Sequence, residues 1–191
     1  MTDLFARLLG PGIADEDTLW VDWRAVIDAA ADADDDGQAG LVALVMRVRD
    51  DRSVRIFGAQ MREAWDLVPP DDRTVEAWTR INAFAARLTA AGMDFALLGL
   101  WSIGTALETS ADVPAHLPAA VQWFKHAGPA LGDRTFGGRS GRLRELAVRD
   151  GLTEGGFNVA RWKFWRRRLE ELARGGDPVA AEGLRSVMLR T

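Results

Sequence analysis

Apolar residues recur at intervals of three and four along almost the whole chain, and no segment alternates steadily between apolar and polar positions. The first spacing places apolar side chains on one face of an α-helix, whereas alternation would indicate a β-strand. The pattern therefore predicts an all-α protein. We expect a single irregular multi-helix domain over residues 1–191, with about eight or nine helices judged from this periodicity.

Cap residues and glycines bound the expected helices. Ser53 and Asp94 are candidate N-caps for the fourth and sixth helices, because their side chains can accept hydrogen bonds from free N–H groups of a first turn. Asn158 is the corresponding candidate for a late helix that ends at Gly175–Gly176. Gly92 is a candidate left-handed stop for the fifth helix, and Gly128–Pro129 is expected to end the seventh.

The segment 95–109 is apolar all round, so it is predicted to be the buried central helix. Its charge-free part is shorter than the roughly 20 residues that a membrane span requires. The amino terminus lacks the basic start and the apolar stretch of a signal peptide. The sequence holds no cysteine, which suits a reducing compartment. We therefore expect a soluble, cytoplasmic protein with no membrane association.

The chain has 8 tryptophans and no tyrosine. Tryptophan brings a large apolar surface and one N–H group that needs a partner when it is buried. This composition predicts a bulky aromatic core or an aromatic-lined pocket.

The net charge of −4 conceals an uneven distribution. Acidic clusters lie in the first third of the chain, whereas residues 133–174 carry an excess of arginine and lysine over acidic residues. Such opposite fields can pair within a fold or attract partners.

An acidic loop carries Asp32, Asp34 and Asp36 before Gly37, the opening pattern of a calcium-binding loop. The twelfth position of such a loop needs a bidentate carboxylate, and Ala43 stands there. A turn that supplies helix caps is the better interpretation, and we expect no metal ion and no cofactor.

A glycine-rich stretch runs from Gly132 to Gly141. It contains a spacing found in phosphate-binding loops, but Gly138 occupies the place of the lysine and no strand is expected before it. A flexible loop with solvated arginines is the favoured interpretation, and a lid is the alternative.

The segment 161–168 mixes basic and aromatic side chains, a composition that nucleic-acid-binding proteins use. At helical spacing, however, Trp162, Trp165 and Leu169 share one face and are predicted to belong to the core. The overall acidic charge also disfavours nucleic acid as a partner.

Glu108 closes the apolar segment 95–109. A carboxylate beside a buried helix is costly unless it is paired, and Arg87 and Arg161 are the candidate partners. A structural salt bridge is favoured over a polar contact inside an aromatic pocket.

Four ordered blocks carry a resemblance to a known family. They are Trp78-x3-Asn82-x-Phe84-x-Ala86-Arg87-Leu88, then Leu97-x2-Leu100-Trp101 with Ala106-x-Glu108, then Pro118-Ala119-Ala120-x2-Trp123, then Phe157-x3-Arg161-Trp162-x2-Trp165-x3-Leu169. In this order they resemble a family of uncharacterised fungal proteins, the domain of unknown function numbered 3632, over roughly residues 78–172. The resemblance implies an all-helical domain and carries no catalytic residue with it.

Two functional hypotheses follow. The first is a non-enzymatic binding or interaction protein, whose partner is another protein or a small molecule. The alternative is a small-molecule-binding protein or enzyme with a tryptophan-lined pocket that contains Glu108 and an arginine. The candidate ligand-binding residues are Trp78, Asn82, Arg87, Trp101, Glu108, Arg161 and Trp162. An enclosed cavity with an exposed Glu108 would favour the alternative.

Overall fold

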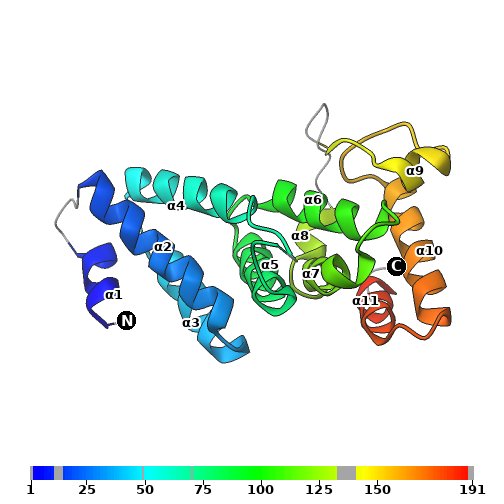
Figure 1. Cartoon of the computed structure of the whole chain (residues 1–191). Helices are drawn as coiled ribbons and strands as arrows, with labels where there is room; N and C mark the ends of the chain where they lie inside the picture. The colour runs from blue at the N-terminus through cyan, green and yellow to red at the C-terminus, as the bar shows by residue number, and fades with distance from the viewer. Residues whose placement is uncertain (1, 11–14, 49, 70, 133–140, 189–191) are drawn as a thin grey trace. The chain divides into compact units, whose positions relative to one another are not determined.

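The structure, a computed structural model, describes residues 2–10, 15–48, 50–69, 71–132 and 141–188. Every regular element in these ranges is helical, which confirms the all-α prediction (Figure 1). The helices are α1 (Thr2–Leu9), α2 (Glu16–Asp32), α3 (Asp35–Val45), α4 (Asp51–Ala64), α5 (Val75–Ala90), α6 (Ala96–Leu107), α7 (Val113–His126), α8 (Gly128–Gly132), α9 (Glu145–Arg149), α10 (Val159–Arg174) and α11 (Pro178–Met188).

These elements outnumber the predicted helices, partly because some are very short. Gly128–Pro129 was expected to end a helix, but α8 begins at Gly128 and continues for 5 residues. Proline is tolerated in a first helical turn, where its missing N–H leaves no hydrogen bond unmade.

The contacts divide the chain into two compact units, Met1–Phe84 and Ala85–Thr191. The boundary falls inside α5, which is followed by Gly92 with a φ of 109°. This left-handed residue is the helix stop that the sequence predicts. The prediction of a single domain stays a prediction.

In the first unit, α2 packs against α3 and α4. The Trp23 side chain is fully buried, and its ring lies 4.6 Å from that of Phe57 between centroids. Its indole N–H donates to the Ser53 hydroxyl at 2.9 Å. The prediction of Ser53 as a cap is wrong, because Asp50 caps α4 by accepting from the Ser53 N–H. The Ser53 hydroxyl instead satisfies a buried tryptophan.

In the second unit, α6 packs against α7, α7 against α11, and α11 against α10 (Figure 1). Most residues of α6 are buried, as its apolar sequence predicts. Gly99 allows the close contact with α7, since a Cβ there would lie 2.6 Å from Cε3 of Trp123. The N-cap of α6 is Phe95 without a side-chain hydrogen bond, so the prediction of Asp94 as the cap is wrong.

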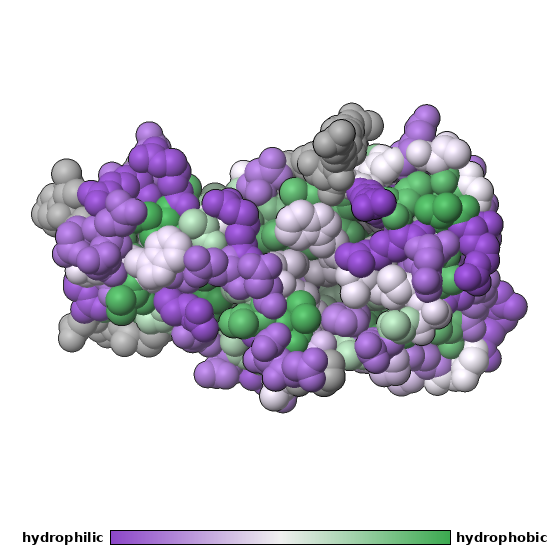
Figure 2. Space-filling view, turned by 45° about the horizontal axis from the view of Figure 1, so that its top comes forward, coloured by the Kyte–Doolittle hydropathy of each residue, from purple (hydrophilic) through white to green (hydrophobic). Residues whose placement is uncertain are grey.

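The surface shown in Figure 2 carries separate apolar patches among hydrophilic side chains. Trp101 of α6 is the largest exposed apolar side chain of the second unit, with 40% of its surface accessible. Within the described ranges, no helix has the length and apolar character needed to cross a membrane.

Candidate functional site

The strongest polar constellation in the second unit joins the end of α6 to the first turn of α10. Arg161 Nε donates to Glu108 Oε1 at 2.6 Å, and Arg161 Nη2 donates to Glu108 Oε2 at 3.0 Å. The two side chains are 1% and 0% exposed, respectively. Asn158 positions Arg161, because its side chain caps α10 by accepting from the Arg161 N–H at 2.9 Å. The Asn158 cap is as predicted, and of the two candidate partners of Glu108, Arg87 and Arg161, it is Arg161 that pairs with it.

The guanidinium of Arg161 uses all five of its N–H groups. Besides the two bonds to Glu108, Nη1 donates to the carbonyls of Gly141 at 2.8 Å and Gly156 at 3.1 Å. The remaining Nη2 hydrogen reaches the carbonyl of Arg142 at 3.2 Å. Arg161 therefore ties two loop segments and one helix end together.

Glu108 is equally saturated. Its Oε1 accepts from Trp165 Nε1 at 2.8 Å as well as from Arg161. Its Oε2 accepts from the Arg144 backbone N–H at 3.0 Å as well as from Arg161. Each carboxylate oxygen thus receives two hydrogen bonds, the number that its lone pairs can take.

Glycines make the two loop carbonyls available to Arg161. A Cβ on Gly141 would lie 2.3 Å from the Gly156 nitrogen, and a Cβ on Gly155 would lie 2.5 Å from the Gly141 carbonyl oxygen. Gly156 also has a φ of 80°, where glycine is favoured. Only a chain without side chains at this crossing brings both carbonyls within reach. Residues 133–140 of the predicted flexible loop lie outside the described residues.

A carboxylate completely shielded and fully hydrogen-bonded has no lone pair for a substrate proton or a metal ion. A buried arginine whose five donors are engaged offers none to a ligand. We call these two residues and the groups bonded to them the Glu108–Arg161 clamp. Its geometry is that of a structural brace, in which each buried charge is compensated.

The other predicted site residues are distributed over both units. Trp78 and Asn82 are buried in the first unit, where Trp78 packs on Trp65 and accepts at its carbonyl from the Asn82 side chain at 2.9 Å. Arg87 and Trp101 lie in the second unit, half-buried and exposed respectively. Among the described residues, the hydrogen bonds to the Glu108 carboxylate come from Arg144, Arg161 and Trp165, and from none of these four.

The acidic loop forms a helix cap. Asp34 is the N-cap of α3, and its carboxylate accepts from the Gly37 N–H at 2.9 Å. Asp32 ends α2, and Asp36 lies exposed in the first turn of α3. The described residues contain no group of three or more His, Cys, Asp or Glu side chains arranged to hold a metal ion.

The burial of Trp162 is lower than predicted, since this residue was expected to belong to the core. Trp165 and Leu169 are fully buried, whereas Trp162 is half-buried at the edge of the same aromatic cluster. Its ring stacks on Phe157 with a centroid distance of 6.0 Å and meets Trp165 edge-on at 5.2 Å. The ring therefore has one face on the core and one side toward a groove.

The Trp162 ring borders a hollow along α10, which we call the Trp162 groove. Its volume is about 330 Å³. It is lined by Gly128, Gly132, Val159, Trp162, Lys163, Arg166 and Val187. Four of these belong to α10 at positions i, i+3, i+4 and i+7, the spacing of one helix face. Helical spacing predicts the inward face of α10 from its tryptophans and leucine, but it does not indicate that this neighbouring stripe borders a groove.

Two donors in the Trp162 groove lack partners within the described chain. The Trp162 indole N–H is shielded from solvent and makes no hydrogen bond. Lys163 is exposed, and no ion pair or hydrogen bond of its ammonium group is found in the described ranges. Arg166 pairs with Glu170 at 3.1 Å, so its charge is partly compensated.

The helices and the Glu108–Arg161 clamp define an all-α protein whose second unit is braced by a sealed ion pair. Comparison with known families gives a more specific placement. The family described as "Protein of unknown function (DUF3632)" matches residues 23–169, and the chain belongs to this family. The match begins well before the blocks from which the resemblance was drawn. No curated protein and no solved structure matches the chain.

Proposed function

We propose that this chain is a non-enzymatic binding protein that takes a small apolar carboxylate in the Trp162 groove. The observation that carries the proposal is the combination in one hollow of apolar walls and an unpaired ammonium group, bordered by a tryptophan whose shielded indole N–H makes no hydrogen bond. A ligand with an apolar body and one anionic end matches all three features.

Size supports a small ligand. A volume of about 330 Å³ lies at the lower end of the range of about 300–1,000 Å³ in which ligand pockets fall. The walls are formed by Val159, the Trp162 ring and Val187, which suit an aliphatic or phenyl group. Burial of such a group in place of water supplies most of the binding free energy.

Charge supports an anionic end. Lys163 and Arg166 both line the groove, and Arg166 alone has a carboxylate partner, in Glu170. The Trp162 N–H makes no hydrogen bond, but it is shielded from solvent, so a ligand reaches it only when the indole ring turns toward the groove. A ligand carboxylate that reached this donor would satisfy a group that is otherwise buried without a hydrogen bond, a situation that costs free energy.

The non-enzymatic part of the proposal is supported by the Glu108–Arg161 clamp. The alternative hypothesis required Glu108 in a tryptophan-lined pocket, and Glu108 is 0% exposed with both oxygens occupied. The lining of the Trp162 groove has basic and apolar side chains. A cytoplasmic location is part of the same proposal, and the cysteine-free sequence is compatible with it.

The test uses 4-phenylbutyrate as the probe and the tryptophan indole ¹H–¹⁵N resonances as the readout. A Trp162→Phe variant assigns the Trp162 resonance by its loss. At about 0.3 kcal/mol for each of its non-hydrogen atoms, about twelve in all, the probe is expected to bind with a Kd of about 2 mM. The Trp162 resonance should shift with saturation, and Lys163→Gln should raise the Kd several-fold.

Arg174→Gln is the matched control, because Arg174 lies on α10 and bonds only to the Glu170 carbonyl among the described residues. The uncharged 4-phenylbutanamide is the control ligand. The proposal predicts an unchanged Kd for Arg174→Gln and weaker binding of the amide. A Trp162 resonance that does not move at about ten times the expected Kd, or equal affinities for acid and amide, would refute it.

A further inference from the structure

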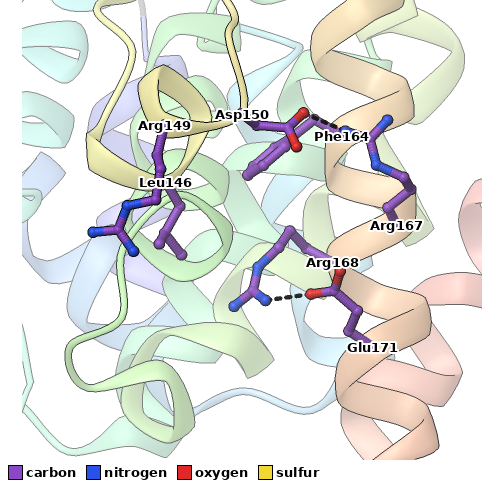
Figure 3. A pocket seen from close by; sticks show the side chains of 7 residues that line it. All are labelled: Leu146, Arg149, Asp150, Phe164, Arg167, Arg168 and Glu171. Carbon is purple, nitrogen blue, oxygen red and sulfur yellow. Dashed lines mark hydrogen bonds and ion pairs between the residues drawn. The ribbon is translucent and has the colours of Figure 1, made fainter.

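A second hollow lies between α9 and α10, on another side of α10 (Figure 3). Its volume is about 200 Å³. It is lined by Leu146, Arg149, Asp150, Phe164, Arg167, Arg168 and Glu171. Its α10 residues again follow i, i+3, i+4, i+7 spacing, starting five positions after those of the Trp162 groove. Five residues correspond to about 140° around the helix axis, so the two hollows are separate. We call this one the arginine hollow.

Arg168 presents an unused edge to the arginine hollow. Its Nη1 is bonded to Glu171, whereas its Nε is shielded from solvent and has no hydrogen-bond partner. Arg161, which lies on the same helix as Arg168, turns its own Nε–Nη2 edge to Glu108. This edge has the geometry for two parallel hydrogen bonds to an oxyanion. In Arg168 this edge makes no hydrogen bond, because Glu171 occupies the opposite nitrogen, but its Nε is shielded, so an oxyanion reaches Nη2 first and Nε only when the side chain turns.

Arg149 supplies a second cation from the other wall. It is exposed at the end of α9, and none of its guanidinium nitrogens has an ion-pair or hydrogen-bond partner in the described part of the chain. Figure 3 shows Arg149 on α9 and Arg168 on α10, with Leu146 between them and the Arg149 guanidinium turned away from Arg168. Arg167, in contrast, is turned to Asp150 and paired with it.

The floor of the hollow is apolar. Leu146 and Phe164 line it, and Phe164 is buried. The two carboxylates in the lining, Asp150 and Glu171, are already paired with Arg167 and Arg168. Hydrogen bonds from Ser110 and, less strongly, the nearby Arg149 guanidinium lower the pKa of the Glu145 carboxyl. The hollow therefore combines this guanidinium, which has an acidic neighbour, an edge of Arg168 that makes no hydrogen bond, and an apolar surface on which an organic group can rest.

We propose that the arginine hollow binds a phosphate group between Arg149 and the Nε–Nη2 edge of Arg168. Arginine is the side chain best suited to phosphate, because its planar fork matches two phosphate oxygens. A dianion also gains more than a carboxylate from two cations in the same hollow, and the exposed Arg149 side chain can turn toward it. The apolar floor favours a phosphomonoester with a small aromatic or aliphatic group over inorganic phosphate.

Two probes distinguish these sources of the phosphate group. Phenyl phosphate and inorganic phosphate are titrated separately into the full chain, with binding followed by the ³¹P resonance and by backbone amide shifts of α9 and α10. We expect both to bind at low ionic strength, phenyl phosphate several-fold more tightly. Equal affinities would overturn the role of the apolar floor, and binding of neither would overturn the site.

Three variants test the assigned residues. Arg149→Gln and Arg168→Gln should each weaken phenyl phosphate binding about tenfold, corresponding to about 1.4 kcal/mol. Glu171→Gln should tighten it, because a competing carboxylate is removed from Arg168. A merely structural ion pair would not give this gain. Arg174→Gln on the same helix is the control and should leave the Kd unchanged.

Equal affinity of the wild type, Arg149→Gln and Arg168→Gln would refute the proposal, as would an equal loss in Arg174→Gln. Arg149 and Arg168 lie outside the lining of the Trp162 groove, so binding of 4-phenylbutyrate should survive in both variants. Failure of one site is thereby distinguishable from failure of the other.

Discussion

Replacing Glu108 by glutamine tests the Glu108–Arg161 clamp most directly. Glutamine has nearly the shape of glutamate, so little packing changes, but the charge that compensates Arg161 is lost. The buried guanidinium, 1% exposed, would keep its charge and retain only the carbonyl partners and one amide oxygen. The new amide NH₂ would face a donor, because Oε2 of Glu108 accepts from the Arg144 N–H and from Arg161 Nη2.

The expected cost follows from these two effects. Removal of one partner of a buried ion pair destabilises a protein by about 3–5 kcal/mol. Against a total stability of about 5–15 kcal/mol, such a loss takes a large share of the folding free energy. Glu170→Gln is the matched control, since Glu170 pairs with Arg166 on the same helix but both side chains are 37% exposed. An exposed i,i+4 pair contributes only about 0.3–0.5 kcal/mol.

Urea unfolding followed by circular dichroism at 222 nm measures both variants. We expect the midpoint of Glu108→Gln to fall far below that of Glu170→Gln, with an unchanged slope. Arg161→Lys is a milder companion, which keeps the charge but loses the fork that reaches several carbonyls. A free energy of unfolding of Glu108→Gln within about 1 kcal/mol of the wild-type value would refute the assignment of the clamp as a brace. A solvated carboxylate would give that result.

Three further predictions concern stability. Gly99→Ala should destabilise the protein by about 1–3 kcal/mol by overpacking, because its Cβ would lie 2.6 Å from the Trp123 ring. Gly40→Ala in α3 should instead stabilise it by about 0.5–1 kcal/mol, because alanine is the better helix former and nothing lies within 4 Å of the new Cβ. Urea midpoints check both, and a loss in Gly40→Ala would contradict the argument. Burial lowers the pKa of His116 below 6.5, so the contribution of its neutral form to stability should be complete above that pH and fall as the pH drops toward the folded-state pKa. The melting temperature of His116→Gln should therefore fall less steeply with decreasing pH in this window than that of the wild type. Equal slopes for the two proteins would contradict the prediction. The single-domain prediction expects one calorimetric unfolding transition, and two resolved transitions would replace it with two domains.

The helices were predictable because their signals are local. A stripe at three and four residue intervals, the side chain of Asn158 as a cap and the left-handed Gly92 each act within a few residues of themselves. Cap residues are less certain where several acceptors compete. Ser53 lies in the first turn of the helix that it was expected to cap, because Asp50, three residues earlier, takes the cap position and leaves the Ser53 hydroxyl to Trp23.

The candidate site was predictable only in part, for a different reason. The pairing of Glu108 with Arg161 could be inferred from the cost of a buried charge, although 53 residues separate them. Nothing in the sequence indicates that the carbonyls of Gly141 and Gly156 complete the arginine's shell, since backbone acceptors have no sequence signature. Nor does composition reveal that Trp162 is half-buried, because helical spacing gives a direction around the axis and not the depth of the neighbouring elements.

The arginines of α10 show how position around one helix decides the role of one residue type. Arg161 points inward, where a charge is tolerable only if every donor is met, and there the loops supply the carbonyls that meet them. Arg168 lies at the boundary, 23% exposed, with one nitrogen paired and one buried without a partner. A fully buried donor without a partner would cost too much free energy, and a fully exposed donor would be hydrated. A donor without a hydrogen bond is therefore tolerated best at this intermediate depth. The same reasoning applies to the Trp162 indole, half-buried on another flank of the helix. We therefore propose ligands beside the residues of these two boundary donors, rather than at the sealed Glu108–Arg161 clamp.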